Sequence, residues 1–560
     1  MAVITTTPPG HVPSAPMTRE EKKVIFASSL GTVFEWYDFY LYGSLTAIIA
    51  RQFFSGLDPT SAYIFALLAF AAGFLVRPFG ALVFGRLGDM IGRKYTFLVT
   101  ILIMGASTFI VGLLPGYASI GIAAPIILIA LRLLQGLALG GEYGGAATYV
   151  AEHAPPGRRG AWTAWIQTTA TLGLFLSLAV ILATRRLVGD AAFEDWGWRV
   201  PFLLSAVLLA VSVWMRLALE ESPVFQQLRA EGRTSKAPLA ESFGRWPNLR
   251  MVLLALFGLV AGQAVVWYAG QFYVLFFMTA VLKVDEATAS VLLCVALLVG
   301  TPFFLLAGAL SDRIGRKPVI LAGLLLAALG LFPVFQHLTL AANPALAQAQ
   351  DRQQVVVTAW PGECSFQGNP VARESDFRAS CDIARRGLAQ DAGSYRKGAA
   401  RAGAPATVRI GEVVLTAPAA RALHGRFDED SHHAIAAFRR DAGEALRAAG
   451  YPESADPARI DKPVVVGLLS LLVICVALVY GPLAAMLAEL FPARIRYTSM
   501  SLPYHLGNGW FGGLMPAIAF AMVAHNGNMY FGLWYPVGIA ALSFVIALLF
   551  LRETRGADLY

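Results

Sequence analysis

Long apolar runs recur along almost the whole chain, and they limit the possible folds more than any other feature of the sequence. A helix needs about 20 mostly apolar residues to cross the roughly 30 Å of hydrocarbon in a bilayer. The runs predict about twelve such helices, at 24–50, 62–84, 95–114, 120–145, 161–183 and 199–219, and, after a basic link, at 251–280, 287–310, 318–340, 463–488, 498–524 and 529–551. We therefore expect an all-α integral membrane protein.

Charged residues are concentrated in one segment of the chain. Only 14% of the 560 residues are charged, whereas a soluble protein carries about 25%. Residues 351–462 nevertheless hold 31 of the 80 charged residues. This imbalance predicts a soluble insert at 341–462 within a very apolar body. The net charge of +8 does not indicate nucleic-acid binding, because the basic residues outside the insert fall in short loops between apolar runs.

The basic residues also predict how the chain is oriented, because cytoplasmic loops of membrane proteins are enriched in Lys and Arg. One set of alternate loops holds Arg19, Lys22, Lys23, Arg86, Arg93, Lys94, Arg158, Arg159, Arg313, Arg316, Lys317, Arg494, Arg496, Arg552 and Arg555. The opposite short loops are poor in bases apart from Arg51, Arg185 and Arg186. We therefore expect a multi-pass protein of the cytoplasmic (inner) membrane with both termini cytoplasmic and the insert outside. Residues 1–23 lack the apolar core and cleavage site of a signal peptide.

The two parts of the body repeat the same charged loop. The segment Asp89-Met-Ile-Gly-Arg-Lys94 matches Asp312-Arg-Ile-Gly-Arg-Lys317, and Glu152 with Arg159 matches Glu489 with Arg496. The repeat divides the chain into a cytoplasmic tail (1–23), a first six-helix half (24–219), a cytoplasmic link (220–250), a second half (251–340 and 463–551) interrupted by the insert between its third and fourth helices, and a second tail (552–560). Two pseudo-symmetric halves around one site suit alternating-access transport.

Charged residues inside two predicted spans need a compensating reason, because a charge at mid-membrane costs at least about 2.5–3.5 kcal/mol. Glu35 and Asp38 lie in the first span and share a predicted helix face with Tyr42. Arg132 lies midway along the fourth span and can hold a carboxylate in a bidentate fashion. The carboxylates are candidate proton carriers, with Asp38 favoured, and Arg132 and Tyr42 are candidate substrate ligands. A purely structural ion pair is the alternative.

Several segments resemble a known transporter family. Gly85-Arg-Leu-Gly-Asp89-Met-Ile-Gly-Arg-Lys94 resembles the loop motif of the major facilitator superfamily, and Arg132-Leu-Leu-Gln-Gly136-Leu-Ala-Leu-Gly140-Gly-Glu142 resembles the fourth-helix motif of its proton-coupled members. Within it the chain is similar to the metabolite:proton symporters, which include shikimate, α-ketoglutarate, citrate and proline/betaine transporters. The segments that carry this similarity are Phe34-Glu-Trp-Tyr-Asp-Phe-Tyr-Leu-Tyr-Gly43, Arg77-Pro-Phe-Gly80, Gly140-Gly-Glu-Tyr-Gly-Gly145, Trp196-Gly-Trp-Arg-Val-Pro201, Glu220-Glu-Ser-Pro223 and Glu553-Thr-Arg-Gly556.

The resemblance implies the major facilitator fold and proton-coupled symport of a small organic acid by alternating access. A zwitterion or osmolyte such as proline or betaine is the alternative substrate class. The resemblance also implies a conformational role for the repeated loops, whose salt bridges latch the outward-open state in the superfamily. The residues assigned to this gate are Asp89, Arg93, Glu152, Arg159, Asp312, Arg316, Glu489, Arg496 and, near the end of its span, Arg77.

Polar and aromatic residues in the second half are candidate substrate ligands. Gln263, Trp267, Tyr268 and Gln271 recur on one face of the seventh span, and Tyr504 and Asn508 lie in the eleventh with His505 between them. Such a lining can orient a hydroxylated or carboxylated solute. Hydrogen bonding between helices is an equally good explanation for any one of these residues.

The insert has the pattern of a small α+β domain. Strand-like runs occupy 355–360 and 406–415, and a helix is expected over 431–449. Cys364 and Cys381 would lie in an oxidising compartment, where a disulfide is expected. His424, His432 and His433 could bind metal, but neighbouring histidines on a charged helix are more often solvated.

The chain shows no nucleophile–base constellation and no phosphate-binding glycine loop, so we expect neither an enzyme nor a cofactor. The expected partners are a small solute, protons and the bilayer, with an unknown partner for the insert as a further possibility. A receptor that uses the insert is the alternative of another class.

Overall fold

The computed structural model describes residues 19–55, 59–155, 157–217, 220–365, 374–391, 394–423 and 426–559, so residues 1–18 of the predicted tail and His424 lie outside the described part. Within this part, ten helical segments are long and apolar enough to cross a membrane. They are α4 (Arg93–Leu113), α6 (Ala123–His153), α7 (Arg159–Val188), α9 (Arg199–Leu217), the continuous run of α12 (Trp246–Ala255), α13 (Ala261–Tyr268) and α14 (Val274–Phe276), then α15 (Glu286–Ile314), α16 (Arg316–Ala342), α20 (Lys462–Tyr480) with α21 (Leu483–Leu490), α22 (Arg496–Leu506) with α23 (Met515–Asn526), and α24 (Trp534–Phe550). Helices α1 (Arg19–Ser44), α2 (Thr46–Phe53) and α3 (Pro59–Met90) precede them.

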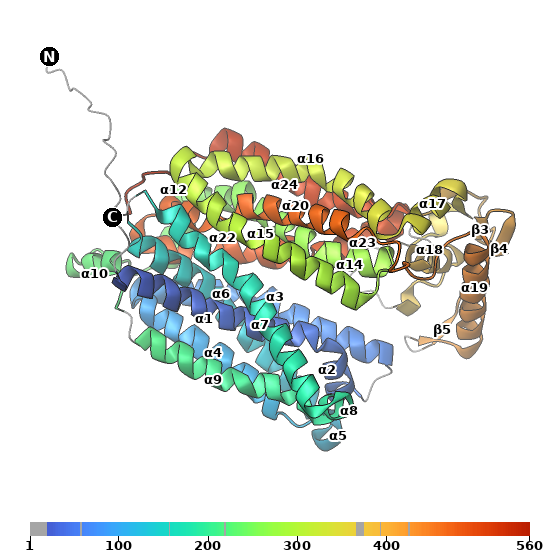
Figure 1. The fold of residues 1–560 in the computed structure, drawn as a ribbon, viewed down its shortest axis with the longest axis horizontal. Helices are drawn as coiled ribbons and strands as arrows, with labels where there is room; N and C mark the ends of the chain where they lie inside the picture. The colour runs from blue at the N-terminus through green and yellow to red at the C-terminus, as the bar shows by residue number, and fades with distance from the viewer. Residues whose placement is uncertain are drawn as a thin grey trace, which may run out of the picture.

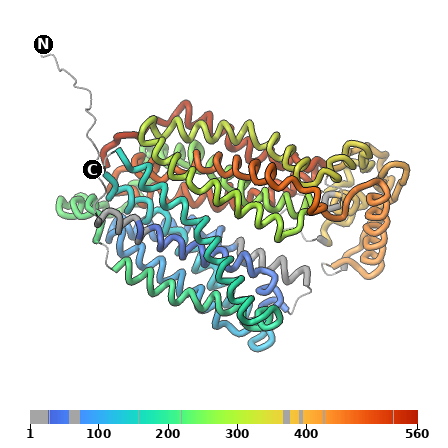
Figure 2. The backbone as a smooth tube through the Cα atoms, viewed as in Figure 1, coloured from blue at the N-terminus to red at the C-terminus, as the bar shows by residue number. Residues whose placement is uncertain are grey.

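The long helices form two groups that lie side by side (Figure 1). In the first half, α3 packs on α6, α1 on α7 and α4 on α9. In the second half, α15 and α16 pack on α20, and α24 packs on α13 and α16. The halves meet where α7 contacts α15 and where α22 contacts α3 and α6. The helices run nearly parallel to one another, as the backbone tube also shows (Figure 2).

Several helices continue beyond the apolar runs that predict them. The second and fourth predicted spans correspond to α3 and α6, which end only at Met90 and His153. Hydropathy stops at the charged residues near these ends, but Asp89 and Glu152 are buried there. Partners in the other half pair with these charges, and this pairing lets the helices extend past the apolar runs.

Helices α3 and α6 approach each other through glycines. A Cβ on Gly136 would overlap the backbone of Gly73, and a Cβ on Gly140 would overlap the backbone of Arg77 and Gly80. Small residues at such spacing let two helix backbones come into contact. This crossing fixes Arg77 on α3 relative to the fourth-helix motif on α6.

Short helices connect the long ones. They are α5 (Tyr117–Ile120), α8 (Asp190–Ala192), α10 (Pro223–Ala230) and α11 (Pro238–Phe243), the last two in the link between the halves. Ser222 caps α10 by accepting a hydrogen bond from the backbone N–H of Phe225 at 3.3 Å.

The insert contains a four-stranded sheet with helices around it. Its elements are α17 (Pro344–Arg352), β1 (Val355–Ala359), α18 (Ser380–Asp391), β2 (Arg396–Ala399), β3 (Thr407–Ile410), β4 (Val413–Thr416), the small pair β5 (Ala422–Leu423) and β6 (Arg426–Phe427), and α19 (Glu429–Ala448). The strand order is β2-β1-β3-β4, with β1 parallel to β2 and the other neighbours antiparallel. The described part of this segment therefore combines strands and helices in one small unit.

Two local features of the insert refine the sequence prediction. The run at 406–415, predicted as one strand, is the hairpin of β3 and β4, because Gly411 turns the chain with a φ of 57°. The predicted helix at 431–449 is α19, which begins earlier because Asp428 caps it by accepting from the N–H of Ser431 at 2.9 Å. Cys364 and Cys381 form a disulfide with their Cα atoms 5.3 Å apart.

The insert lies at the end of the bundle opposite the C-terminus (Figure 1). Backbone hydrogen bonds attach it to loops of the second half. Tyr395 N–H donates to Gly527 O at 2.6 Å and Ala455 N–H donates to Lys283 O at 2.9 Å. The insert is thus joined to the second half by more than its two chain connections.

Candidate functional site

A narrow cavity of about 30 Å³ lies between the two halves. Its lining residues come from α1, α3, α6, α13, α20 and α22; they are Thr32, Glu35, Trp36, Phe39, Arg77, Leu139, Tyr143, Trp267, Tyr268, Tyr480, Tyr504 and His505, with Asn508 from the turn after α22. Five residues predicted as proton or substrate groups are therefore brought together here: Glu35, Trp267, Tyr268, Tyr504 and Asn508. The cavity is too small for a metabolite in this conformation, since about one water-sized probe fills 10–15 Å³.

The cavity carries one acid and one base in addition to His505. Glu35 is 7% exposed and Arg77 is 7% exposed. The guanidinium carbon of Arg77 lies 4.3 Å from the ring centre of Phe74 and 5.2 Å from that of Phe39. Arg77 was predicted to belong to the gate, but the structure places it in the central cavity, because α3 continues well past it before the charged loop begins.

Aromatic side chains from both halves make up most of the lining. The ring centres of Trp36 and Trp267 are 5.8 Å apart, and those of Trp267 and Tyr268 are 4.9 Å apart. Elsewhere in the lining, Tyr504 stacks on Tyr143 with the two ring centres 3.5 Å apart. The faces of these rings are the kind of surface that attracts a cation.

Helix α13 and the residues around it are irregular where they reach the cavity. π-Helical turns at Leu256–Val260 and Ala269–Tyr273 flank α13, and a third covers Gly507–Gly512 after α22. Such turns shift the helical register and are frequent at functional sites. They change which faces the side chains of the seventh and eleventh spans present.

Two other predicted ligands of the second half lie outside the described cavity lining. Gln263 is 1% exposed, and its Oε1 accepts from Asn508 Nδ2 at 3.2 Å. Gln271 is buried in the π-helical turn after α13. Gln263 therefore makes the hydrogen bond between helices that was the alternative explanation for these polar residues.

Asp38 and Arg132 form a second polar cluster inside the first half. Asp38 Oδ1 accepts from Ser205 Oγ at 2.7 Å and the carboxylate also hydrogen bonds to Thr108. Arg132 donates to Gln135 Oε1 at 2.6 Å, and Gln135 Nε2 donates to Thr108 Oγ1 at 2.7 Å. Asp38 and Arg132 are thus connected through two neutral side chains.

Tyr42 belongs to the same cluster. The Arg132 guanidinium lies 4.0 Å from its ring centre. Arg132 and Arg77 both line a second narrow pocket of about 10 Å³ beside the cavity. Glu35 lines the cavity, whereas Asp38 contacts Ser205 on α9. The two carboxylates of α1 therefore lie in different environments.

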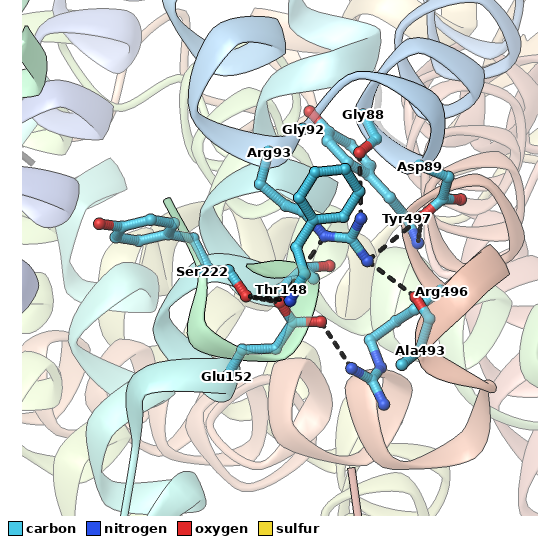
Figure 3. Close-up of polar contacts among 12 residues, drawn as sticks. Gly88, Asp89, Gly92, Arg93, Thr148, Glu152, Ser222, Ala493, Arg496 and Tyr497 are labelled. Carbon is cyan, nitrogen blue, oxygen red and sulfur yellow. Dashed lines mark hydrogen bonds and ion pairs between the residues drawn. The ribbon is translucent and has the colours of Figure 1, made fainter. Parts of the chain in front are cut away.

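Eight of the nine residues predicted for the gate meet at the end of the bundle that carries the C-terminus. In the first cluster, the Arg93 guanidinium lies 3.4 Å from Asp89 and 3.6 Å from Glu152 (Figure 3). Arg496 of the second half donates to Glu152 at 2.6 Å. We call the eight residues Asp89, Arg93, Glu152, Arg159, Asp312, Arg316, Glu489 and Arg496 the latch.

The second cluster of the latch repeats the first. Arg316 lies 2.5 Å from Asp312 and 3.2 Å from Glu489. Arg159 of the first half lies 3.5 Å from the same Glu489. Each half therefore supplies one arginine to a buried glutamate of the other half.

The latch aspartates also cap helices across the interface. Asp89 accepts from the backbone N–H groups of Tyr497 at 3.3 Å and Thr498 at 2.8 Å, in the first turn of α22. Asp312 accepts from Gly160 at 2.9 Å and Ala161 at 2.8 Å, in the first turn of α7. Carboxylates are stabilising at helix N-termini, so these contacts hold the halves together on this side.

Sequence reasoning missed some residues of these sites. Phe39 lies four residues after Glu35 and Trp36 lies three residues before Phe39, so helical spacing would have indicated both as residues of the cavity lining. Glu221 accepts from the backbone N–H groups of Arg93 and Lys94, as Glu553 does from Arg316 and Lys317. Glu221 and Glu553 occupy equivalent positions at the ends of the two halves, as the latch residues do within them. In the sequence, their segments served only as evidence of the family resemblance.

Comparisons with known proteins agree with this architecture. The model of the family described as sugar (and other) transporter matches residues 23–350. The inner membrane metabolite transport protein YhjE of Escherichia coli (strain K12) is 38% identical over 333 residues, which cover 58% of this chain and 75% of that protein. The alpha-ketoglutarate permease of the same strain is 35% identical, covering 62% of this chain and 78% of that protein.

The proline/betaine transporter of Escherichia coli (strain K12) is 38% identical over 315 residues, 54% of this chain, and the chain spans only 62% of that relative's length. Among solved structures, the proton:xylose symporter XylE bound to 6-bromo-6-deoxy-D-glucose is 16% identical with a TM-score of 0.62, covering 96% of this chain and 98% of that one. This similarity shows the fold. The chain belongs to the sugar (and other) transporter family of the major facilitator superfamily, whose members matched here are membrane transporters and not enzymes.

Proposed function

We propose that this chain is a secondary active transporter that carries a small carboxylate-bearing solute together with protons by alternating access. The observation that carries the proposal is the cavity between the halves, in which Arg77 and Glu35 stand among aromatic rings while the latch closes one end. Rocking of the halves would open the latch and expose the same residues to the other side.

The proposal includes twelve spans, because α1 and α3 lie in the first half beside α4, α6, α7 and α9 and complete a set of six (Figure 1). Basic loops support a cytoplasmic location for the latch end, both termini and the link at 220–250. The insert at 341–462 then lies outside the membrane, which suits its disulfide. The halves are residues 24–219 and 251–340 with 463–551.

Within the site, Arg77 is the proposed ligand of the substrate carboxylate. Arg77 is the arginine among the residues that line the cavity. A guanidinium binds a carboxylate with two parallel hydrogen bonds. Trp267, Tyr268, Tyr504 and Asn508 would contact the rest of the solute. Arg132 and Tyr42 flank the adjoining pocket, and Glu35 with Asp38 supplies the protonatable groups.

A zwitterion is the second candidate substrate, and the aromatic lining specifically favours it. A quaternary or secondary ammonium is attracted to the faces of Trp and Tyr rings. Trp36, Trp267 and Tyr268 offer such faces in the same cavity as the Glu35 carboxylate. A solute with an ammonium at this side and a carboxylate at Arg77 would match the charges of the cavity.

Uptake into proteoliposomes tests the proposal. Radiolabelled proline, glycine betaine and α-ketoglutarate are offered with and without an inward proton gradient. Accumulation of one class that a protonophore abolishes is the expected result. Arg77→Gln should then raise the KM strongly, while Arg86→Gln, at an exposed position on the same helix, should leave the KM unchanged. Uptake that ignores the gradient would contradict proton coupling.

The receptor alternative receives no support from the comparisons, and a deletion tests it. A chain lacking 345–460 should keep transport if the insert is accessory. If the intact chain transports no solute and the insert binds a ligand, a receptor is favoured instead.

A further inference from the structure

Three charged side chains follow one another through the interior of the first half. Arg216 near the end of α9, Glu142 on α6 and Glu35 on α1 are 2%, 0% and 7% exposed, respectively. Glu35 lines the cavity, whereas Arg216 lies toward the latch end of the bundle. This row of three side chains therefore leads from the proposed substrate site toward the latch end, through the interior of the first half.

Arg216 is held firmly as the permanent positive charge of the row. Its Nη2 donates to Glu142 Oε1 at 3.1 Å, and its Nη1 donates to Phe97 O at 3.1 Å. The guanidinium carbon lies 3.2 Å from the centre of the Phe97 ring. Gly31 of α1 faces the guanidinium, and a Cβ at this position would overlap Arg216 Nη2. The space for Arg216 therefore depends on glycine in the first helix.

The two glutamates contact each other. Their carboxyl groups are hydrogen bonded, yet within the described residues Oε2 of each has no donor partner. Two ionised carboxylates have acceptors only, so they cannot hydrogen bond to each other. A hydrogen bond between them therefore needs one shared proton, as in other carboxyl pairs of this kind.

We infer that Glu35 and Glu142 together hold the transported proton, with Arg216 as the fixed counter-charge. The inference rests on the proposed proton symport and narrows it, since Asp38 is already satisfied by Ser205 and Thr108. Asp38 then acts on the pair only through its charge.

The same geometry couples the proton to the solute. With one proton, the charges of the pair and Arg216 cancel, and Arg77 is free to bind a substrate carboxylate. When the proton leaves, the pair carries one negative charge more and Glu35 competes for Arg77, the arginine that lines the same cavity. Release of the proton therefore weakens substrate binding. The charged and titratable groups that face Glu35 are Asp38, Arg77, Glu142, Arg216 and Tyr480, with Tyr143, Tyr268, Tyr504 and His505 also lining its cavity.

The test separates exchange from net accumulation, using the full-length chain in proteoliposomes. Substrate counterflow needs no net proton movement, so Glu142→Gln should keep it, because the amide can donate to Glu35 as the shared proton does. An inward gradient of one pH unit should drive up to about tenfold accumulation by the unmodified chain and none above equilibrium by the variant. The control Glu286→Gln, exposed in the first turn of α15, should accumulate normally.

Substrate binding to purified protein gives an independent readout. Trp36 and Trp267 line the cavity, so their fluorescence should report binding. The apparent Kd of the unmodified chain should rise with pH, whereas that of Glu142→Gln should not. If Glu142→Gln does not fold, Glu142→Asp keeps the carboxyl and should fold with an altered pH dependence.

Gradient-driven accumulation by Glu142→Gln with an unchanged pH profile would overturn the inference. If Glu142→Asp has to be used, a pH dependence of binding equal to that of the unmodified chain would overturn it as well. Absence of any gradient effect in the unmodified chain would instead refute proton symport itself, so the two failures are distinguishable.

Discussion

Replacement of Asp89 by asparagine should weaken the closed state of the latch without unfolding either half. Asp89 contributes to the interface in two ways, because it pairs with Arg93 at 3.4 Å and accepts from two backbone N–H groups of α22. Asparagine keeps only one acceptor oxygen. Its NH2 group would face one of the two N–H donors, so one contact across the interface is lost.

The magnitude follows from the contacts that are lost. A hydrogen bond to a charged group contributes about 1.5–3 kcal/mol, and a carboxylate at a helix N-terminus contributes about 0.3–2 kcal/mol. The amide retains part of both, so the closed state should lose about 1–3 kcal/mol relative to the open state. Such a difference changes the ratio of the two states by about 5- to 150-fold.

Distance measurements between spin labels report this ratio. Trp214 on α9 of the first half and Trp246 at the start of α12, the helix that leads from the link into the second half, are exposed and lie near the latch end. Labels at cysteines in these positions, with Cys294 and Cys475 replaced by serine, should show one main distance in the unmodified latch. Asp89→Asn should add a longer distance at the expense of the shorter one.

The matched control is Asp285→Asn. Asp285 caps α15 by accepting from the N–H of Thr288 at 3.0 Å, so it loses the same kind of contact but within one half. It should lower thermal stability slightly and leave the label distances unchanged. An unchanged distribution in Asp89→Asn, or an equal change in Asp285→Asn, would refute the latch argument.

Three further substitutions test other parts of the structure. Gly140→Leu should abolish monodisperse protein on size-exclusion chromatography because its side chain enters the backbone of α3, whereas Gly467→Leu, where a Cβ meets open space, should not; equal behaviour of the two would contradict the close packing. Cys381→Ser should cost the insert about 3 kcal/mol, the value expected for a loop of about 15 residues, seen as protease sensitivity confined to the insert. Thr554→Val removes a 2.8 Å hydrogen bond to Glu489 and should weaken the latch by about 1 kcal/mol, so a label distribution like that of the unmodified chain would argue against this contact.

The latch was the part of the site most open to prediction from the sequence. Its residues stand in a motif that occurs twice at matching positions, and the charge of each has an obvious complement. The structure adds what a repeat cannot contain, namely that Arg159 and Arg496 cross over to the glutamate of the other half. Partner choice depends on how the halves pack, which no local spacing records.

The central cavity was predicted less completely because helix rotation decides which residues reach it. Glu35 and Asp38 are three residues apart, which leaves their side chains about 60° apart around a helix. This angle is enough to direct Glu35 to the cavity and Asp38 to Ser205. Arg77 lies in the cavity lining and not with the latch for a related reason, since the depth of its side chain in the bundle depends on how far α3 continues.

The latch and the carboxyl pair are physically connected by Tyr497. Its backbone N–H donates to Asp89 in the latch, and its hydroxyl donates to the carbonyl of Gly141, the residue before Glu142. Its ring fills the space beside Gly88 and Gly144, where any Cβ would overlap a neighbour.

In the proposed alternating-access cycle, opening of the latch would withdraw Tyr497 from α6, because α22 would move with the second half. Withdrawal would admit water next to Glu142 on the side of the chain termini, while the other face of the pair remains in the cavity with Glu35. The proton would then leave only after the halves separate at this end. Packing of one tyrosine on glycines would thus give the order of events that the proposed symport requires, with the two halves as the only moving parts.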